Sequence, residues 1–124
     1  MRRVLIVEDD ADGRTLLINM LQRVELEPEG ARSAEEATRL LDKYKYDAVV
    51  IDLMLPGMDG LALLKIIRSS LHTTRLCCAA VTAFHSESIR KQALEIGFDL
   101  YFTKPLDMNT FVNRLKTAIE EVQH

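Results

Sequence analysis

Six side chains in this sequence could do chemistry together, because each stands at or just after the end of a short apolar run. They are Glu8, Asp9, Asp10, Asp52, Thr82 and Lys104. Carboxylates brought together repel one another and raise the pKa of at least one of them, unless a cation lies between them. Carboxylate oxygens with positions left for water and phosphate are the ligands that Mg²⁺ (or Mn²⁺) prefers. Together with the lysine and the threonine, they predict a magnesium site in which a phosphoryl group is bonded to Asp52.

The elements that must position these residues follow from the alternation of apolar runs with stretches of helical period, a pattern typical of βαβ units. The runs that predict strands are VLIV at 4–7, AVVI at 48–51, CCAAV at 77–81 and LYF at 100–102, with a polar edge strand near 26–30 that contains Pro28. We therefore predict an α/β fold, a flavodoxin-like doubly wound sheet of five parallel strands in the order 2-1-3-4-5 with five helices. The carboxyl ends of neighbouring strands then lie about 4.8 Å apart on one edge, which brings residues 8–10 close to Asp52.

Apolar spacing and capping residues place the helices. One predicted apolar face consists of Leu16, Leu17, Met20, Leu21 and Val24, and that of the last helix consists of Met108, Phe111, Val112, Leu115, Ala118, Ile119 and Val122. The predicted capping residues are the Ser33–Glu36 capping box, Ser86 and Asp107 as N-caps, and Gly97 as a C-cap. Asp59 and Gly60 predict the turn that opens a helix, so Asp59 is left out of the site.

The composition fits a single globular domain over residues 1–124 and argues against several functions. The 16 basic and 19 acidic residues give a net charge of -3, which provides no basic field for direct nucleic-acid binding. The N-terminal stretch MRRVLIVEDD has too short an apolar run for a signal peptide or a membrane span, so we expect no membrane contact and a cytoplasmic location. Cys77 and Cys78 are neighbours inside an apolar run, which predicts buried free thiols.

Four stretches of the chain resemble the receiver domain of two-component response regulators, of which the chemotaxis regulators are an example. They are VLIVEDD at 4–10, DLMLPGMDG at 52–60, VTA at 81–83 and GFDLYFTKP at 97–105. Each stretch alone is a weak signal, but their order and spacing match the family over essentially the whole chain. The chain ends soon after its last predicted helix, which suits either a stand-alone regulator or the receiver of a longer protein.

The resemblance implies a role for each residue of the site. Asp52 would be the phosphate acceptor, and Thr82 and Lys104 would contact the phosphoryl oxygens. Mg²⁺ would be held by Glu8, Asp9, Asp52 and the backbone carbonyl of Met54. Tyr101 would be the switch aromatic, next to a cis peptide bond before Pro105.

The resemblance also implies partners and a mode of action. The phosphoryl group would come from a phosphohistidine of a histidine kinase or a phosphotransfer protein. A downstream protein or output domain would bind the face formed by the fourth helix, fifth strand and fifth helix. Such a domain is not a conventional enzyme, but it catalyses its own phosphorylation and dephosphorylation. Glu8 stands where many members carry Asp, and Phe84 and Phe98 are bulky for the family; none of these departures removes a required chemical group.

Three other functions share parts of this pattern. A flavin carrier needs a loop rich in Ser, Thr and Gly after the first strand, where this chain has three acids. A haloacid-dehalogenase-like Mg²⁺-dependent phosphatase needs Asp-x-Asp, and Asp52-Leu53-Met54 lacks the second acid. A non-phosphorylated, protein-binding receiver is disfavoured because no residue of the site is missing.

Overall fold

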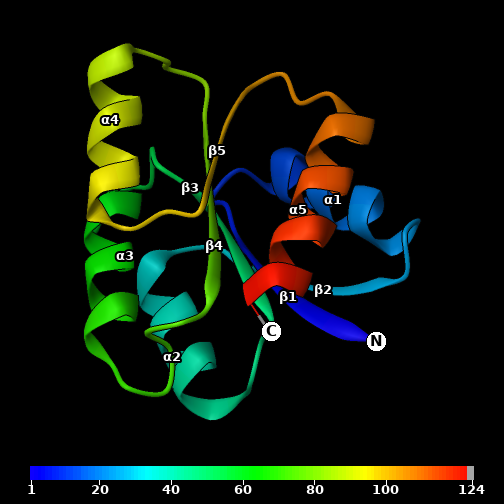
Figure 1. Cartoon of the computed structure of the whole chain (residues 1–124), viewed down its shortest axis with the longest axis horizontal. Coiled ribbons are helices and arrows are strands. Elements are labelled where there is room, and N and C mark those ends of the chain that lie inside the picture. Colours follow the sequence, from blue (N-terminus) through cyan, green and yellow to red (C-terminus); the bar gives the residue numbers. More distant parts are fainter. Residues whose placement is uncertain (123–124) are drawn as a thin grey trace.

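The predicted strands form one parallel sheet in the order β2-β1-β3-β4-β5 (Figure 1), as expected from the sequence. A computed structural model describes residues 1–122 of the chain. The strands are β1 (Arg2–Val7), β2 (Leu26–Ala31), β3 (Ala48–Asp52), β4 (Cys77–Thr82) and β5 (Leu100–Thr103). The helices are α1 (Ala11–Gln22), α2 (Ala34–Lys43), α3 (Gly60–Ser69), α4 (Glu87–Ile96) and α5 (Met108–Val122). All four strand pairs are parallel, so every strand ends at the same edge of the sheet.

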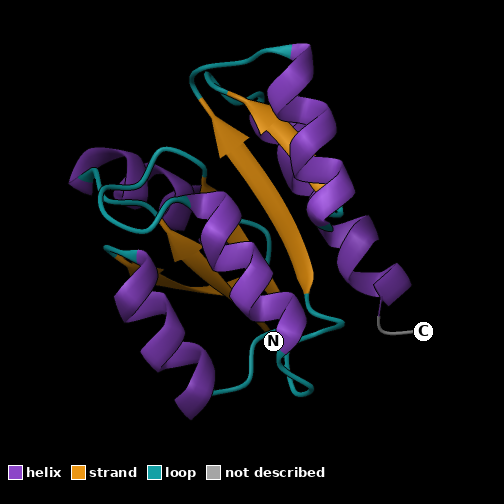
Figure 2. Ribbon diagram, turned by 90° about the vertical axis from the view of Figure 1, so that its left-hand side faces the viewer, coloured by secondary structure: helices purple, strands orange, loops and turns teal. Residues whose placement is uncertain are grey.

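Helices cover both faces of the sheet, which explains why the inner strands are apolar throughout (Figure 2). Alternate side chains of each strand point to opposite faces, so Leu5 and Val7 pack on one side of β1 and Val4 and Ile6 on the other. One face carries α1 and α5, and the other carries α2, α3 and α4 (Figure 1). β3 and β4 are buried on both faces along their whole length.

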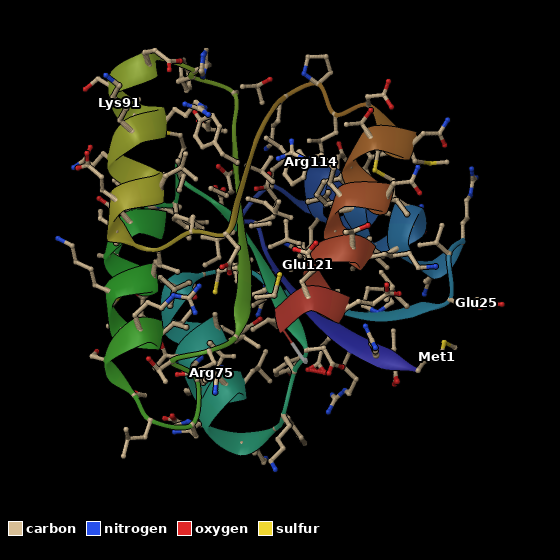
Figure 3. The ribbon with its side chains drawn as sticks, in the orientation of Figure 1. Met1, Glu25, Arg75, Lys91, Arg114 and Glu121 are labelled. Atoms are coloured by element: carbon tan, nitrogen blue, oxygen red, sulfur yellow. The ribbon has the colours of Figure 1, made fainter. Side chains whose placement is uncertain are left out.

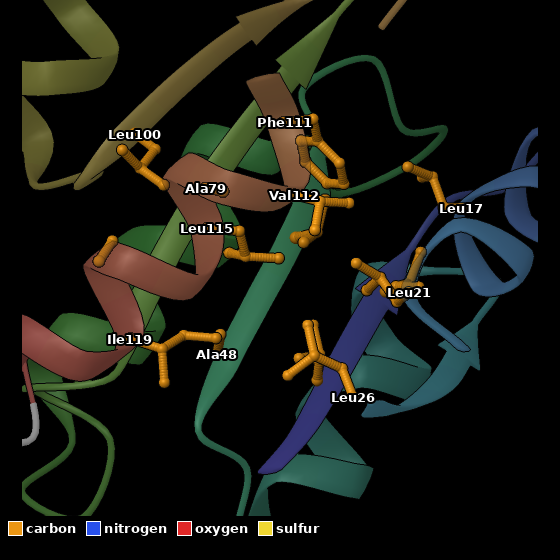
Figure 4. Packing of buried hydrophobic residues seen from close by; sticks show 14 of the residues in the cluster. Leu17, Leu21, Leu26, Ala48, Ala79, Leu100, Phe111, Val112, Leu115 and Ile119 are labelled. Carbon is orange, nitrogen blue, oxygen red and sulfur yellow. The ribbon is translucent and has the colours of Figure 1, made fainter. Parts of the chain in front are cut away.

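The core between the sheet and the pair α1 and α5 is built from large aliphatic and aromatic side chains (Figure 4). Its labelled members include Leu17 and Leu21 of α1 and Phe111, Leu115 and Ile119 of α5. In α5 the residues predicted on the apolar face are buried or partly buried from 108 to 119, as expected. The side chain of Val122 lies outside the described residues.

Two members of the predicted α1 face differ in the structure. Val24 lies beyond the end of the helix at Gln22, although it packs against the core, and Leu16 is 56% exposed. The buried residues of α1 are Leu17, Met20 and Leu21. At 3.6 residues per turn, Leu16 lies roughly 90° from the centre of that stripe. The prediction was wrong because the helix buries a narrower stripe than its apolar residues cover.

Side-chain caps fix where the helices begin. Ser86 and Asp107 accept hydrogen bonds from the backbone N–H groups of Ile89 and Thr110, so both are N-caps as predicted. The capping box is also present, with one difference. Ser33 Oγ accepts from the N–H of Glu36, but the Glu36 carboxylate accepts from the N–H of Arg32 instead of that of Ser33. The predicted C-cap Gly97 ends α4 with φ of 128°, a backbone angle that favours glycine.

The two cysteines are buried free thiols, as predicted. Cys77 faces the α1 and α5 side of the sheet and Cys78 the other. Burial raises the pKa of both thiols to about 12, so both stay neutral. Among residues 1–122, no helix has the length and apolar character needed to cross a bilayer.

The two outer strands, β2 and β5, differ from the inner ones. β2 contains the predicted Pro28 between Glu27 and Glu29, and β5 has only four residues. Met1 and Glu25 stand directly before β1 and β2 (Figure 3) and mark the amino-terminal edge of the sheet. The residues considered below gather at the opposite, carboxyl-terminal edge.

Candidate phosphorylation site

Three of the predicted acids meet at the carboxyl-terminal edge of the sheet. Glu8, Asp9 and Asp52 each offer an oxygen, and these oxygens all lie within 4.8 Å of one another. They come together because β1 and β3 are neighbours that end at the same edge, with Val7, the last residue of β1, opposite Ile51. The fourth acid, Asp10, turns away to accept a hydrogen bond from Gly13 N at 2.8 Å and caps α1.

Lys104 supplies the positive charge between two of these acids. Its Nζ donates to Glu8 Oε1 at 3.1 Å and to Asp52 Oδ2 at 3.2 Å. Burial by itself lowers the pKa of Lys104, but the hydrogen bond to Glu8 and the charges of Asp52 and Glu8 outweigh it and raise the pKa. The ammonium group is therefore held charged beside the carboxylate of Asp52.

Glu8 is the most buried acid of the site, with 2% of its surface exposed. Its Oε2 is buried and has no hydrogen-bond partner among residues 1–122. Burial first, and then the neighbouring Asp52 carboxylate, raise the pKa of Glu8 to about 8. A buried carboxylate oxygen without a partner is costly, and a divalent cation bound by Glu8, Asp9 and Asp52 would satisfy it. The residues present therefore fit Mg²⁺.

Asp52 is held in a fixed orientation at the end of β3. Its Oδ1 accepts from the backbone N–H of Met54 at 2.9 Å, while Oδ2 faces Lys104. Gly60 leaves room for this turn, because a Cβ there would lie 2.7 Å from the backbone oxygen of Asp52. The contact between these two residues is made by the Met54 amide, and the Met54 carbonyl as a metal ligand stays a prediction.

Thr82 lies at the end of the next strand, β4, and is 1% exposed. Its Oγ1 accepts from the backbone N–H of Phe84 at 3.0 Å. Its carbonyl accepts from the N–H of Lys104 at 2.9 Å, which ties the strand ends that carry these two side chains. The predicted cis peptide bond lies between Lys104 and Pro105.

Tyr101 lies half-buried on β5, on the sheet face covered by α4. Its hydroxyl is 3.1 Å from Nδ1 of the exposed His85, and the two ring centroids are 5.7 Å apart. Burial, and then the charge of Glu87, raise the pKa of Tyr101. The contact with His85 was not predicted from the sequence. The spacing of the histidines in the sequence argues only against a metal site.

A second missed contact involves Arg14 of α1. Its Nη1 donates to the backbone oxygen of Glu8 at 2.9 Å and to that of Asp9 at 3.4 Å. The only signal that the sequence contains for it is the short spacing between the acids and Arg14, which lies in the first turn of the helix that follows them.

Glu8→Gln is expected to stabilise the metal-free protein by an amount that grows with pH. In the folded state the Glu8 carboxyl loses its proton near pH 8, whereas its ordinary pKa is 4.5. Below pH 4.5 both states hold the proton, so wild type and variant should be equally stable. Between the two values unfolding of the wild type releases a proton, so its stability falls relative to the variant; above about pH 8 the difference becomes constant. Urea unfolding in EDTA across this range measures the difference.

A matched control for this experiment is Glu27→Gln, because Glu27 is exposed on the edge strand β2. We expect no growth of the stability difference with pH for this variant. Added Mg²⁺ should stabilise the wild type more than Glu8→Gln, so that in Mg²⁺ the wild type becomes the more stable of the two. A Glu8→Gln variant less stable than wild type near pH 8 in EDTA would show that Lys104 requires an ionised Glu8.

The fold and the site together define a class of protein: a doubly wound α/β domain with a cluster of acids and a lysine beside one aspartate. The sequence profile of the response regulator receiver domain matches residues 4–116, and the chain belongs to this family. The predicted fold class, the resemblance and the function as a response regulator receiver are thereby confirmed. Family membership also favours this function over the flavin carrier and the phosphatase.

Curated relatives and solved structures agree with this assignment. The phosphate regulon transcriptional regulatory protein PhoB of Klebsiella pneumoniae is 31% identical over 121 residues, which cover 98% of this chain and 53% of PhoB. The chain thus spans about half the length of the curated relatives it matches. A putative response regulator from Chloroflexus aurantiacus superposes with a TM-score of 0.92 and 32% identity, over 96% of this chain and 98% of that one.

A further solved structure bears on the metal. The receiver domain of the sensor histidine kinase PA1611 from Pseudomonas aeruginosa superposes with a TM-score of 0.88 and 26% identity, over 96% of this chain and 98% of that one. That structure has a magnesium ion coordinated in the active site cleft. Receiver domains bind Mg²⁺ at an acidic pocket, and this chain has an acidic cluster formed by Glu8, Asp9 and Asp52.

Proposed function

We propose that Asp52 accepts a phosphoryl group from a phosphohistidine of a histidine kinase or a phosphotransfer protein. The observation that carries this proposal is the position of Lys104 Nζ between Glu8 Oε1 and Asp52 Oδ2, next to the partnerless Glu8 Oε2. A lysine in contact with the aspartate, and a carboxylate beside it that can bind a metal ion, match the charge that develops in phosphoryl transfer.

In this mechanism Asp52 is the nucleophile. One of its carboxylate oxygens attacks the phosphorus in line, so that an O–P bond forms while the N–P bond to the donor imidazole breaks. Lys104 then moves from the carboxylates to an oxygen of the transferred group, and the Thr82 hydroxyl donates to another. Glu8, Asp9, Asp52 and the Met54 carbonyl would hold Mg²⁺, which when bound neutralises charge on the phosphoryl oxygens. Water can later cleave the acyl phosphate at the same place, so the domain catalyses both gain and loss of the group.

Phosphorylation would change the position of Tyr101 and, with it, the surface formed by α4, β5 and α5. Thr82 Oγ1 would exchange its bond with Phe84 N–H for one to the phosphoryl group, which moves the loop that carries His85. The contact between His85 and the Tyr101 hydroxyl would then break, and the ring could turn inward. On this face a groove of about 410 Å³ is lined by side chains that include His85, Tyr101 and Arg114. We propose that a downstream protein or output domain binds there.

The attachment of α4 supports this route. Arg68 of α3 donates to the Gly97 carbonyl through Nε at 3.1 Å and Nη2 at 2.8 Å, and Nη2 also contacts Asp99 at 3.0 Å. The C-terminal end of α4 is thereby held to α3. Ala93 is the only fully buried residue of α4, so its N-terminal end, next to His85, is the part that can respond to phosphorylation.

Phosphoryl transfer between proteins tests the proposal directly. A phosphotransfer protein carrying ³²P-phosphohistidine is mixed with the chain in Mg²⁺ or in EDTA. We expect label to move to the chain only in Mg²⁺. Release of inorganic phosphate from a phosphomonoester, without a labelled protein intermediate, would instead favour the phosphatase.

The same proposal includes a cytoplasmic location, a single domain over 1–124 and no direct contact with nucleic acid. The net charge of -3 supports the last of these.

We expect slow loss of the phosphoryl group, because the side chains of Met54 and Phe84 should border the path of water to the phosphorus and neither can hold an attacking water by a strong hydrogen bond. Met54 follows Asp52 by two residues and Phe84 follows Thr82 by two, and both are more than half exposed. The double variant Met54→Asn with Phe84→Glu should lose phosphate about tenfold faster. This is less than the roughly 10²-fold or more that a well-placed general base contributes. The decay of purified phosphoprotein in Mg²⁺ measures this.

Leu71→Asn with Leu94→Glu is the matched control, because both leucines are exposed and belong to other parts of the chain. Its phosphoprotein should decay at the wild-type rate. If Met54→Asn with Phe84→Glu decays no faster than wild type, the two side chains do not shield the phosphorus.

A further inference from the structure

We propose that Arg14 is a positioning residue for the loop that carries two of the metal-binding acids. Its guanidinium Nη1 donates to the backbone oxygens of Glu8 and Asp9, at 2.9 Å and 3.4 Å. Within residues 1–122 no carboxylate lies at ion-pair distance from Arg14. Its charge is therefore directed at the two loop carbonyls instead of an acid.

Two consecutive carbonyls held by one rigid group leave the backbone of the loop little freedom. Both contacts come from the same nitrogen, Nη1, which restrains the peptide after Glu8 through the shorter bond and the peptide after Asp9 through the longer one. The loop is also held from β2, because Glu8 N–H donates to the Ala31 carbonyl at 3.0 Å. The directions in which the Glu8 and Asp9 side chains leave the backbone are set by these contacts, and so is the oxygen cluster with Asp52.

The path of the Arg14 side chain shows that β2 makes room for it. A Cβ on Gly30 would lie 2.9 Å from Arg14 Cδ and 3.2 Å from Arg14 Cγ. The aliphatic stem therefore passes against the backbone of β2 at the one residue of that strand without a side chain. Any side chain at position 30 would shift the stem and with it the guanidinium.

Positioning and charge make opposite predictions for Arg14, which makes the inference testable. A positive charge near a cation site weakens Mg²⁺ binding by Coulomb repulsion, so if charge were its only effect, removing it would tighten binding. If Arg14 positions the ligands, removing it loosens the loop and weakens binding. The inference rests on the proposed function only in that the acids bind Mg²⁺.

The experiment measures Mg²⁺ and Mn²⁺ affinity by calorimetry, and stability by urea unfolding, for the full chain of 124 residues. Arg14→Met should weaken Mg²⁺ binding by about 10–100-fold, the usual effect of losing a group that orients metal ligands. Arg14→Lys keeps the charge but lacks the Nη1 that donates to both carbonyls, so it should also weaken binding, by a smaller factor. Gly30→Ala, which changes no charge, should weaken it too. Arg39→Met, at an exposed arginine of α2, should bind as wild type does.

The outcomes separate this inference from the proposed function. If the wild type binds Mg²⁺ and Arg14→Met binds it equally or more tightly, the inference is overturned but the proposed function is not. A loss of stability in Arg14→Met and Gly30→Ala without a change in metal affinity would mean that the contact is only structural, and would also overturn it. Failure of the wild type itself to bind Mg²⁺ would overturn the proposed function, and the inference with it. If Arg14→Met does not fold, Arg14→Lys and Gly30→Ala decide.

Discussion

Asp52→Asn is expected to abolish phosphorylation of the chain by acetyl phosphate in Mg²⁺. The amide has no carboxylate oxygen that can attack phosphorus, and its NH₂ group would face Lys104 in place of Oδ2. The variant should still fold, because the amide oxygen can accept the Met54 N–H that Asp52 Oδ1 accepts now. Intact-mass measurement should show one phosphoryl group on the wild type and none on the variant.

Asp42→Asn is the matched control, because Asp42 is exposed on α2 and pairs only weakly with His72 at 3.8 Å. This variant should gain the phosphoryl group at the wild-type rate. Equal labelling of Asp52→Asn would mean that another residue is the acceptor. If neither the wild type nor the control gains the group from any donor, while a downstream partner still binds, the chain would be a non-phosphorylated receiver.

Lys104→Met is expected to change two properties in opposite directions. The ammonium occupies oxygens of Glu8 and Asp52, so its removal should tighten Mg²⁺ binding. It should also slow phosphorylation by roughly 10²–10³-fold, the usual cost of removing one fixed group that stabilises charge in a transition state. Calorimetry measures the Mg²⁺ affinity, and the rate at which the mass of the protein increases with acetyl phosphate measures the phosphorylation rate.

Lys91→Met provides the control, since Lys91 lies on the outer side of α4 (Figure 3) and is exposed. Neither property should change. A Lys104→Met variant phosphorylated as fast as the wild type would show that Lys104 takes no part in transfer. Weaker Mg²⁺ binding by this variant would show that the lysine orders the carboxylates instead of competing for them.

The arrangement of the backbone could be predicted because it depends on patterns that the sequence contains. Apolar runs fixed the strands, and the parallel order put the residue after each run at one edge. The convergence of Glu8, Asp9 and Asp52 follows from that rule alone, without knowledge of any side-chain conformation.

What could not be predicted depends on how individual side chains pack. The buried Glu8 Oε2 without a hydrogen-bond partner among residues 1–122 results from the rotamer of one glutamate. Gly13 makes room for that rotamer, because a Cβ there would lie 2.7 Å from Glu8 Oε1. The Arg14 contact needs a side-chain stem that passes Gly30, and the contact between His85 and Tyr101 joins a loop to β5 through exposed atoms. No periodicity or motif encodes such contacts.

The two outer strands of the sheet determine how this protein can associate. An uncovered strand can template a new strand from another chain, which leads to strand exchange or fibrils. In β2 the donor that such pairing needs is missing at Pro28, and the like charges of Glu27 and Glu29 repel an identical neighbour; β5 offers only four residues. We therefore expect copies of this domain to meet through helical surfaces, so that a concentrated preparation stays free of β-aggregates.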